Sequence, residues 1–252
     1  MKAYLYDGTF EGLLTALYQG LREDNPHLRI EAAADYEPDL FTETKTLATD
    51  HALSDRLFSL IRQEMSSLTL RHVYRMYLSE KPDAGTLLLA FLLKGFRIGP
   101  GINGLVTDPV VHPVLATSRQ VSRESHRLLG LLRFQELKNG LFYAAYEPDF
   151  HQTPLIAPHF VHRLSSHPWI IHDLKRELAA CWDTSQWILQ DLPAGENTFI
   201  SAEEESLQQL WQSYFHHIAI RQRTNPRVQR SFMPKKYWKH LVEVPGKQKT
   251  AE

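Results

Sequence analysis

The sequence predicts an α+β fold in which an N-terminal strand and a helical block precede an antiparallel sheet with flanking helices. Two observations favour this fold class. Between residues 50 and 99, apolar residues recur at helical spacing. From Leu131 onward, short β-prone runs are separated by turn signals, and Asn139-Gly140 is a strong hairpin signal. Helices gathered before strands, without strict alternation, are typical of α+β proteins.

The opening stretch YLYDGTFEGLLTAL predicts a strand over 3–6, a turn at Asp7-Gly8 and a helix from Phe10, with Thr9 as its N-cap. Asp-Gly-Thr after a strand also occurs in phosphatases whose nucleophile is an Asp two residues earlier. Leu5 stands at that position here and cannot attack phosphorus. We therefore interpret Asp7-Gly8-Thr9 as a structural corner.

The remaining elements follow from periodicity and turn residues. A second strand is expected at 29–33, and the polar stretch 35–46 is expected to be a loop. Helices are expected at 53–65, 70–78, 86–96 and 114–132, with the glycine-rich break GPGING before the last of them. Further on we expect a hairpin at 131–149, a helix at 153–164, a strand at 168–172, a hairpin at 178–191 and an amphipathic helix at 203–221.

The glycine-rich break suggests a division into residues 1–100 and 101–244, followed by a disordered tail at 245–252, unless the whole chain is one integrated domain. The single cysteine, Cys181, excludes an internal disulfide and fits a reducing compartment. The longest apolar run, TLLLAFLL, is far shorter than the ~20 residues of a membrane span. We expect a soluble, cytoplasmic protein that does not enter a membrane.

The net charge of −1 conceals an asymmetry. Residues 221–252 contain nine Lys or Arg and two Glu, a balance of +7, so the rest of the chain carries −8. Within that end, the stretch Arg221–Leu241 interleaves seven cations with Phe232, Tyr237 and Trp238. Cations neutralise phosphates and aromatic rings stack on bases, so this stretch predicts nucleic-acid binding. The alternative is that the aromatic side chains anchor the tail on the core while the cations are solvated.

The predicted DNA contacts within this basic stretch are Arg221, Arg223, Arg227, Arg230, Lys235, Lys236, Trp238 and Lys239. Arg123 and Arg127 lie one turn apart on a predicted helix, and Arg176 follows a predicted strand. These three arginines are expected to make secondary contacts with phosphates or to pair with carboxylates of the acidic body.

Two charged clusters are candidates for chemistry. His172 and Asp173 end a predicted buried strand, and a His–Asp pair suits proton transfer. His126 or His159 would complete such a site, provided that these side chains converge in one cleft. The pairs His159/His162 and His216/His217 lack the HExxH pattern of zinc helices, so no metal or other cofactor is expected. We interpret Cys181, in the apolar run LAACW, as an inert buried thiol.

Five stretches spread from residue 4 to 241 together resemble an uncharacterised bacterial family of proteins assigned to DNA metabolism or repair. They are YLYDGTFEGLLTALY, ESHRLLGLLRFQEL, YEPDFHQTPLIAPHFVHRL, IIHDLKRELA and NPRVQRSFMPKKYWKHL. The resemblance implies a companion role, because members are encoded beside a radical-SAM DNA modification or repair protein. A similar domain is also fused to uracil-DNA-glycosylase-like domains. Charged positions within the matching stretches are His126, Arg127, His159, Arg163, His172, Asp173, Arg176, Arg230, Lys235 and Lys236.

These observations favour an accessory protein that binds DNA, a radical-SAM or glycosylase-type DNA-processing partner, or both. With one cysteine, the chain cannot itself hold a CxxxCxxC iron–sulfur cluster. Two alternatives stay open. One is an enzyme that acts on a nucleotide or a flipped base through the His/Asp site. The other is an adaptor whose basic end binds an acidic patch on a partner protein, without contact to nucleic acid.

Overall fold

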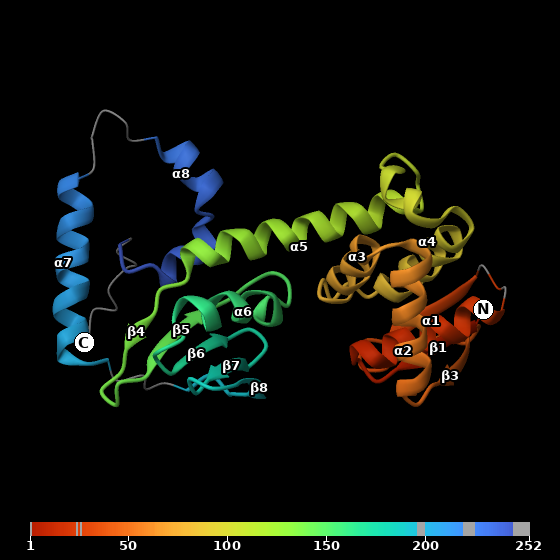
Figure 1. Cartoon of the computed structure of the whole chain (residues 1–252), viewed down its shortest axis with the longest axis horizontal. Helices are drawn as coiled ribbons and strands as arrows, with labels where there is room; N and C mark the ends of the chain where they lie inside the picture. Colours follow the sequence, from red (N-terminus) through yellow and green to blue (C-terminus); the bar gives the residue numbers. More distant parts are fainter. Residues whose placement is uncertain (1, 24, 26, 196–199, 219–224, 244–252) are drawn as a thin grey trace. The chain divides into compact units, whose positions relative to one another are not determined.

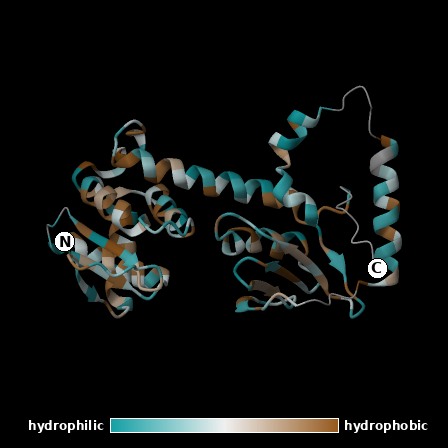
Figure 2. Cartoon of the chain, turned by 180° about the vertical axis from the view of Figure 1, so that it is seen from behind, coloured by the Kyte–Doolittle hydropathy of each residue, from teal (hydrophilic) through white to brown (hydrophobic). Residues whose placement is uncertain are grey.

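The computed structural model describes residues 2–23, 25, 27–195, 200–218 and 225–243. The chain forms two compact units, Met1–Ser122 and Arg123–Glu252 (Figure 1). The sequence suggested a division near residue 100, whereas the division between the compact units falls inside the long helix α5, Val111–Leu131. Figure 2 shows hydrophobic residues concentrated within each unit, while the middle of α5 is mostly hydrophilic.

The first unit combines a three-stranded parallel sheet with a group of helices. Strand β1 (Lys2–Tyr6) lies between β2 (Leu28–Ala32) and β3 (Glu43–Thr46) and is parallel to both. The region 35–46 was expected to be a loop, and β3 is missed by periodicity because its side chains are polar and exposed. The helices are α1 (Phe10–Glu23), α2 (His51–Leu60), the π-helix η1 (Ile61–Met65), α3 (Ser67–Tyr77), α4 (Ala84–Ile98) and the 3-10 helix η2 (Gly99–Gly104).

The Asp7-Gly8-Thr9 corner has the geometry that the sequence predicts. Gly8 has a φ of 84°, a left-handed conformation that glycine adopts without strain. The hydroxyl oxygen of Thr9 accepts a hydrogen bond from the backbone N–H of Gly12 at 2.9 Å, as an N-cap does. The Asp7 carboxylate accepts hydrogen bonds from the Thr9 hydroxyl and the Thr49 hydroxyl, at 2.6 and 2.7 Å. The corner is therefore closed by its own side chains.

Helix α4 is the central core helix of the first unit. Leu88, Phe91 and Leu92 are fully buried. A Cβ on Gly85 would lie 2.5 Å from the carbonyl oxygen of Ile30, so glycine lets α4 approach β2 closely. Among the described residues, the stretch Ala84–Gly104 has the length and hydropathy of a membrane span, a property that core helices of globular proteins share. The buried side chains of α4, among them Leu88, Phe91 and Leu92, belong to the hydrophobic core of the first unit.

The second unit contains a five-stranded sheet in the order β4-β5-β6-β7-β8. Its strands are β4 (Gln135–Glu136), β5 (Phe142–Tyr146), β6 (Trp169–Asp173), β7 (Leu178–Trp182) and β8 (Trp187–Asp191). Three of the strand pairs are antiparallel, including both predicted hairpins. The expectation of a purely antiparallel sheet is wrong for β5 and β6, which are parallel. Helix α6 (Thr153–Arg163) carries the chain between them as a crossover, which parallel neighbours require.

Helices α5 and α6 cover one face of this sheet. The buried apolar side chains of the second unit come from α5, α6, β5, β6 and β7, together with Tyr237 from the C-terminal segment. The chain ends, as described, with α7 (Ala202–Ile218), α8 (Pro226–Phe232) and the 3-10 helix η4 (Lys235–His240). The predicted tail at 245–252 lies outside the described residues.

Candidate nucleic-acid interface

Two charged side chains, those of Asp173 and Arg176, lie where β6 ends beside its parallel neighbour β5. This end of parallel strands is where ligands commonly bind. Asp173, the last residue of β6, is fully buried. One of its oxygens accepts a hydrogen bond from the Arg176 guanidinium at 2.9 Å, and the other accepts one from the Lys175 backbone N–H at 3.1 Å. Burial raises the pKa of Asp173, although the Arg176 guanidinium acts in the opposite direction. Arg176 therefore balances a buried carboxylate.

Glu124 of α5 accepts several hydrogen bonds, although the sequence analysis did not identify it as a site residue. Its carboxylate, 4% exposed, accepts the backbone N–H groups of Asp149 and Phe150 at 2.9 and 3.0 Å. It also accepts the Lys236 ammonium at 2.7 Å and the Tyr237 hydroxyl at 2.5 Å. Burial by itself would raise the pKa of Glu124, but these hydrogen bonds outweigh it and hold the pKa below its ordinary value. Glu124 is the ionised centre of a polar cluster.

The sequence does hold a signal for Glu124. The residues 114, 117, 121, 124 and 128 recur at the i, i+3, i+4 spacing of one helix face, and all five are buried. An acidic residue on an apolar face requires donors from elsewhere in the fold. That requirement was overlooked because Glu124 lies between Arg123 and the exposed pair His126 and Arg127.

The Glu124 cluster anchors η4 on the second unit. Tyr237 is 3% exposed, and Lys236 also pairs with Asp149 at 2.5 Å. Lys239 pairs with Glu147 at 2.5 Å. The interpretation of this tail as an anchored segment therefore holds for η4, and the carboxylates that balance its cations come from α5 and the loop after β5.

Other cations of the second unit have no such partner. Several exposed cations of this unit form no ion pair with any carboxylate in the described part of the chain, among them five that lie on α5, α8 and the first residue of η4: Arg123, Arg127, Arg227, Arg230 and Lys235. We call these five residues the basic face. The guanidinium of Arg127 donates to the Ser231 carbonyl oxygen at 3.4 Å, so α5 lies next to the end of α8. Arg221 and Arg223, which the sequence also predicts as DNA contacts, lie outside the described residues.

The aromatic residues of the basic stretch differ in their surroundings. Trp238 is half-buried, its ring nitrogen donates to the Met233 carbonyl oxygen at 2.8 Å, and the Lys235 ammonium lies 6.0 Å from its ring. Phe232, by contrast, is 72% exposed at the end of α8. The ring that is free to stack on a ligand at the basic face is therefore that of Phe232.

The four histidine and aspartate candidates do not form one constellation. His172 and Asp173 are successive strand residues, so their side chains point to opposite faces of the sheet. The Leu192 carbonyl oxygen lies 2.7 Å from Nε2 of His172, and the Tyr143 hydroxyl lies 2.7 Å from Nδ1. A carbonyl can only accept, so Nε2 donates to Leu192, and the Tyr143 hydroxyl engages Nδ1. His126 and His159 are exposed, on α5 and α6 respectively.

Two other sequence features can be placed in the structure. Within the described ranges, no group of three or more His, Cys, Asp or Glu side chains is arranged to hold a metal ion. His217 of the His216/His217 pair contacts the Ser213 carbonyl oxygen of its own helix at 2.7 Å. Cys181 is a free, half-buried thiol whose pKa is raised by burial, which disfavours the reactive thiolate.

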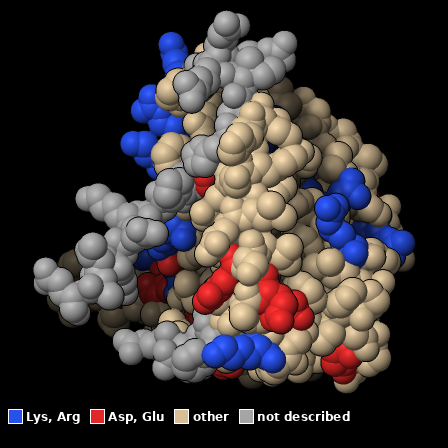
Figure 3. Space-filling view, turned by 90° about the vertical axis from the view of Figure 1, so that its left-hand side faces the viewer, with Lys and Arg blue, Asp and Glu red and all other residues tan. Residues whose placement is uncertain are grey.

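Helix α7 turns the polar side chains of Glu204 and Gln212 toward the protein, whereas its large apolar side chains are exposed. On the inner side, Glu204 accepts from the Glu136 backbone N–H at 3.2 Å, and Gln212 donates to the Val242 carbonyl oxygen at 2.9 Å. Five large apolar residues of this helix are between 44% and 66% exposed, and we call them the apolar stripe: Leu207, Leu210, Trp211, Tyr214 and Ile218. Trp211 is the least exposed of them, and its ring nitrogen also donates to the Glu243 carboxylate. Figure 3 shows an uncharged surface along α7 that ends in acidic side chains. The sequence predicts the amphipathic pattern but not its orientation.

The fold and this site define a two-unit α+β protein whose second unit carries a basic face and an exposed apolar helix face. The chain belongs to the family described as a domain of unknown function, DUF4130, whose match spans residues 82–243. The matched region runs from α4 to η4 and so includes the Glu124 cluster, the basic face and α7. No curated protein matches the chain.

Proposed function

We propose that this protein is a cytoplasmic accessory protein of DNA metabolism or repair, and that it binds the DNA backbone through the basic face. The observation that carries the proposal is that these five exposed cations have no described carboxylate partner. Other cations of the same unit, Lys236, Lys239 and Arg176, are each paired with a carboxylate. Cations kept in water at a shared surface are available to neutralise phosphates and release counterions.

The arrangement suits the phosphate backbone rather than base edges. Arg123 and Arg127 lie one helical turn apart on α5, and Arg127 contacts the end of α8, which carries Arg227 and Arg230. Arginine forks bind phosphate oxygens in two-point contacts. Phe232 supplies an exposed ring at the same end of α8, on which an unpaired base can stack. Such a surface positions a protein on DNA, and in this proposal a partner protein carries out the reaction on the DNA.

The partner we propose is a DNA-processing enzyme of the radical-SAM or glycosylase type, as the family resemblance implies. A second candidate function is a protein–protein adaptor without nucleic-acid binding, and the apolar stripe of α7 favours it. Contiguous apolar surface of several hundred Å² marks interaction sites on folded proteins. A helix that presents apolar residues at i, i+3, i+4 and i+7 fits the apolar groove of a partner.

A His/Asp enzyme is not favoured by the geometry of the described residues. His172 has both ring nitrogens engaged, Asp173 is bound by Arg176, and the two side chains lie on opposite faces of the sheet.

The test is binding of labelled single- and double-stranded DNA across a salt series. We expect the logarithm of the binding constant to fall steeply with the logarithm of salt concentration, and each lost phosphate contact to lower the slope by about 1. The quadruple variant Arg123→Gln, Arg127→Gln, Arg227→Gln and Arg230→Gln should abolish most of that dependence. Absence of binding at low salt would reject the DNA proposal and leave the adaptor.

A further inference from the structure

The first unit contains a hollow with mixed lining that the proposed function does not use. It has a volume of about 630 Å³, within the range of small-molecule sites, and lies between α1, α2, η1 and α4. Its apolar lining includes Leu57, which is fully buried, and the half-buried Leu93 and Phe96. Apolar surface of this kind takes the body of a ligand out of water.

Three arginines from three different helices line the same hollow. Arg22 comes from α1, Arg56 from α2 and Arg97 from α4. All three are exposed, and none forms an ion pair with a carboxylate in the described ranges. The Arg56 guanidinium lies 5.7 Å from the ring of Tyr18, another lining residue. Three like charges beside one apolar hollow repel one another, and an anion would relieve that repulsion.

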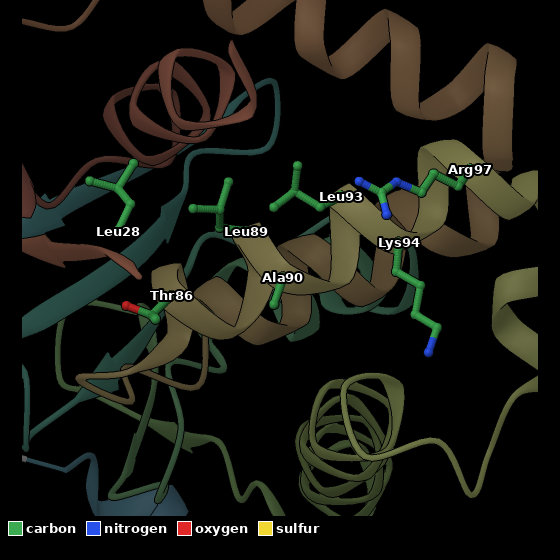
Figure 4. A pocket seen from close by; sticks show the side chains of 7 residues that line it. All are labelled: Leu28, Thr86, Leu89, Ala90, Leu93, Lys94 and Arg97. Atoms are coloured by element: carbon green, nitrogen blue, oxygen red, sulfur yellow. The ribbon is translucent and has the colours of Figure 1, made fainter. Parts of the chain in front are cut away.

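A second hollow of about 500 Å³ shares two lining residues, Leu93 and Arg97, with the first. Figure 4 shows Leu28, Leu89 and Leu93 of this second hollow, with the guanidinium of Arg97 extended beside Leu93. Arg97 therefore stands where the two apolar surfaces meet. The joint lining is apolar along α4 and cationic at this position.

We propose that the larger hollow binds a nucleoside phosphate, with the phosphate at Arg22, Arg56 and Arg97 and the base against Phe96 and Tyr18. Arginine guanidinium groups bind phosphate oxygens in two-point contacts, and aromatic rings offer a stacking surface to any base. This inference does not rest on the proposed DNA interface, because every lining residue belongs to the first unit.

Glu64 favours a base over an acyl chain as the body of the ligand. This exposed residue of η1, which carries a carboxylate, also lines the hollow. A lipid tail would take that carboxylate out of water without offering it a donor, which costs free energy. The amino group of guanine, adenine or cytosine offers such a donor. We therefore expect nucleotides whose base carries an amino group to bind more tightly than thymidine monophosphate.

The experiment is isothermal titration of the full chain with deoxyguanosine monophosphate, thymidine monophosphate, inorganic phosphate and decyl phosphate. We expect saturable binding of the guanine nucleotide, weakened about tenfold or more in Arg22→Gln/Arg97→Gln. Arg62→Gln, an exposed arginine of η1 that does not line the hollow, is the matched control and should bind normally. Glu64→Gln should reduce the preference for guanine over thymine. Thermal unfolding of each variant verifies that it is folded.

Four other outcomes of the titration would overturn the proposal, and a competition experiment would identify the source of the ligand. No nucleotide binding at millimolar concentration, or equal binding by the Arg22→Gln/Arg97→Gln variant, would overturn the proposal. Inorganic phosphate binding as tightly as the nucleotide would show that the apolar lining is not used, and tighter binding of decyl phosphate would identify a lipid site; both would also overturn it. A 5′-phosphorylated oligonucleotide that competes with the mononucleotide would identify a strand end as the source of the ligand, and failure to compete would identify the free nucleotide.

Discussion

Helix α8 and the adjoining 3-10 helix η4 both come from the basic C-terminal stretch, yet Arg227 and Arg230 of α8 have surroundings opposite to those of Lys236 and Lys239 of η4. In η4, Lys236 pairs with Glu124 and Asp149, and Lys239 pairs with Glu147. In α8, Arg227 and Arg230 are exposed and have no described carboxylate partner. The comparison shows that one run of cations in a sequence can contain two kinds of side chain. Some form ion pairs within the fold, and others stay exposed and available to a ligand.

The buried tyrosine explains why η4 is the anchored part. Burying Tyr237 brings its hydroxyl to Glu124, and that carboxylate then recruits Lys236. Because Glu124 is 4% exposed, its charge requires these donors, whereas Arg227 and Arg230 of α8 are exposed to water.

The largest effect is expected from Glu124→Ala. The change leaves the Tyr237 hydroxyl and two backbone N–H groups without their acceptor and removes one of the two carboxylates that pair with Lys236. It should lower the free energy of unfolding by about 3 kcal/mol. Urea denaturation followed by circular dichroism measures it. Glu205→Ala, an exposed acid of α7, is the control and should change stability by less than about 0.5 kcal/mol. Equal stability of the two variants would show that the Glu124 cluster does not hold the unit together.

Tyr237→Phe should have a smaller effect of the same kind. It removes only the hydroxyl that donates to Glu124 and keeps the buried ring, so we expect a loss of about 1–2 kcal/mol. Lys236→Gln combined with Tyr237→Phe should cost less than the sum of the two single changes, because both donors serve one carboxylate. Additive losses in such a double-mutant cycle would argue against a shared cluster.

The pH dependence of stability isolates the charge on Glu124. Because its pKa in the folded protein lies below the ordinary value of 4.5, its contribution is fully present above that value. The contribution is lost as the pH falls through the lowered pKa. The difference in unfolding free energy between the wild type and Glu124→Gln should therefore shrink on acidification from about pH 6 to about pH 3. A difference that is constant over this range would mean that folding does not lower the pKa of Glu124.

The smallest effect on stability is expected for the apolar stripe. Leu210→Glu places a charge on a side chain that is 66% exposed, so unfolding should change by less than about 0.5 kcal/mol. Glu204→Ala, on the inner side of the same helix, removes the acceptor of the Glu136 backbone N–H and should cost more. A larger loss for Leu210→Glu would show that the stripe is packed within the protein rather than left for a partner.

Local sequence patterns predicted most of the helices and strands, because periodicity and turn residues depend only on residues that are close in sequence. The parallel pairing of β5 and β6 was missed because the pattern of an apolar strand does not reveal the direction of its partner. The orientation of α7 was missed for the same kind of reason. The residues Leu207 and Leu210 mark an apolar face, but only tertiary contacts at Glu204 and Gln212 decide which face points inward.

The candidate site, too, was predicted only in part. The cations were visible in the sequence, whereas their partners lie more than 80 positions away, as Lys236 and Glu124 do. Lys239 likewise meets Glu147 across the fold. Lys236 and Lys239, which the sequence predicts as DNA contacts, are thus paired with carboxylates of the fold, because their charge is balanced in space rather than along the chain.

The most direct test of the account compares two double variants in the same salt series of DNA binding. For Arg227→Gln/Arg230→Gln we predict a slope reduced by about 2 with unchanged thermal stability. For Lys236→Gln/Lys239→Gln we predict an unchanged slope with a lower melting temperature. The reverse pattern, in which the η4 lysines set the slope and the α8 arginines do not, would contradict the division of the basic stretch into an anchor and a DNA-binding face.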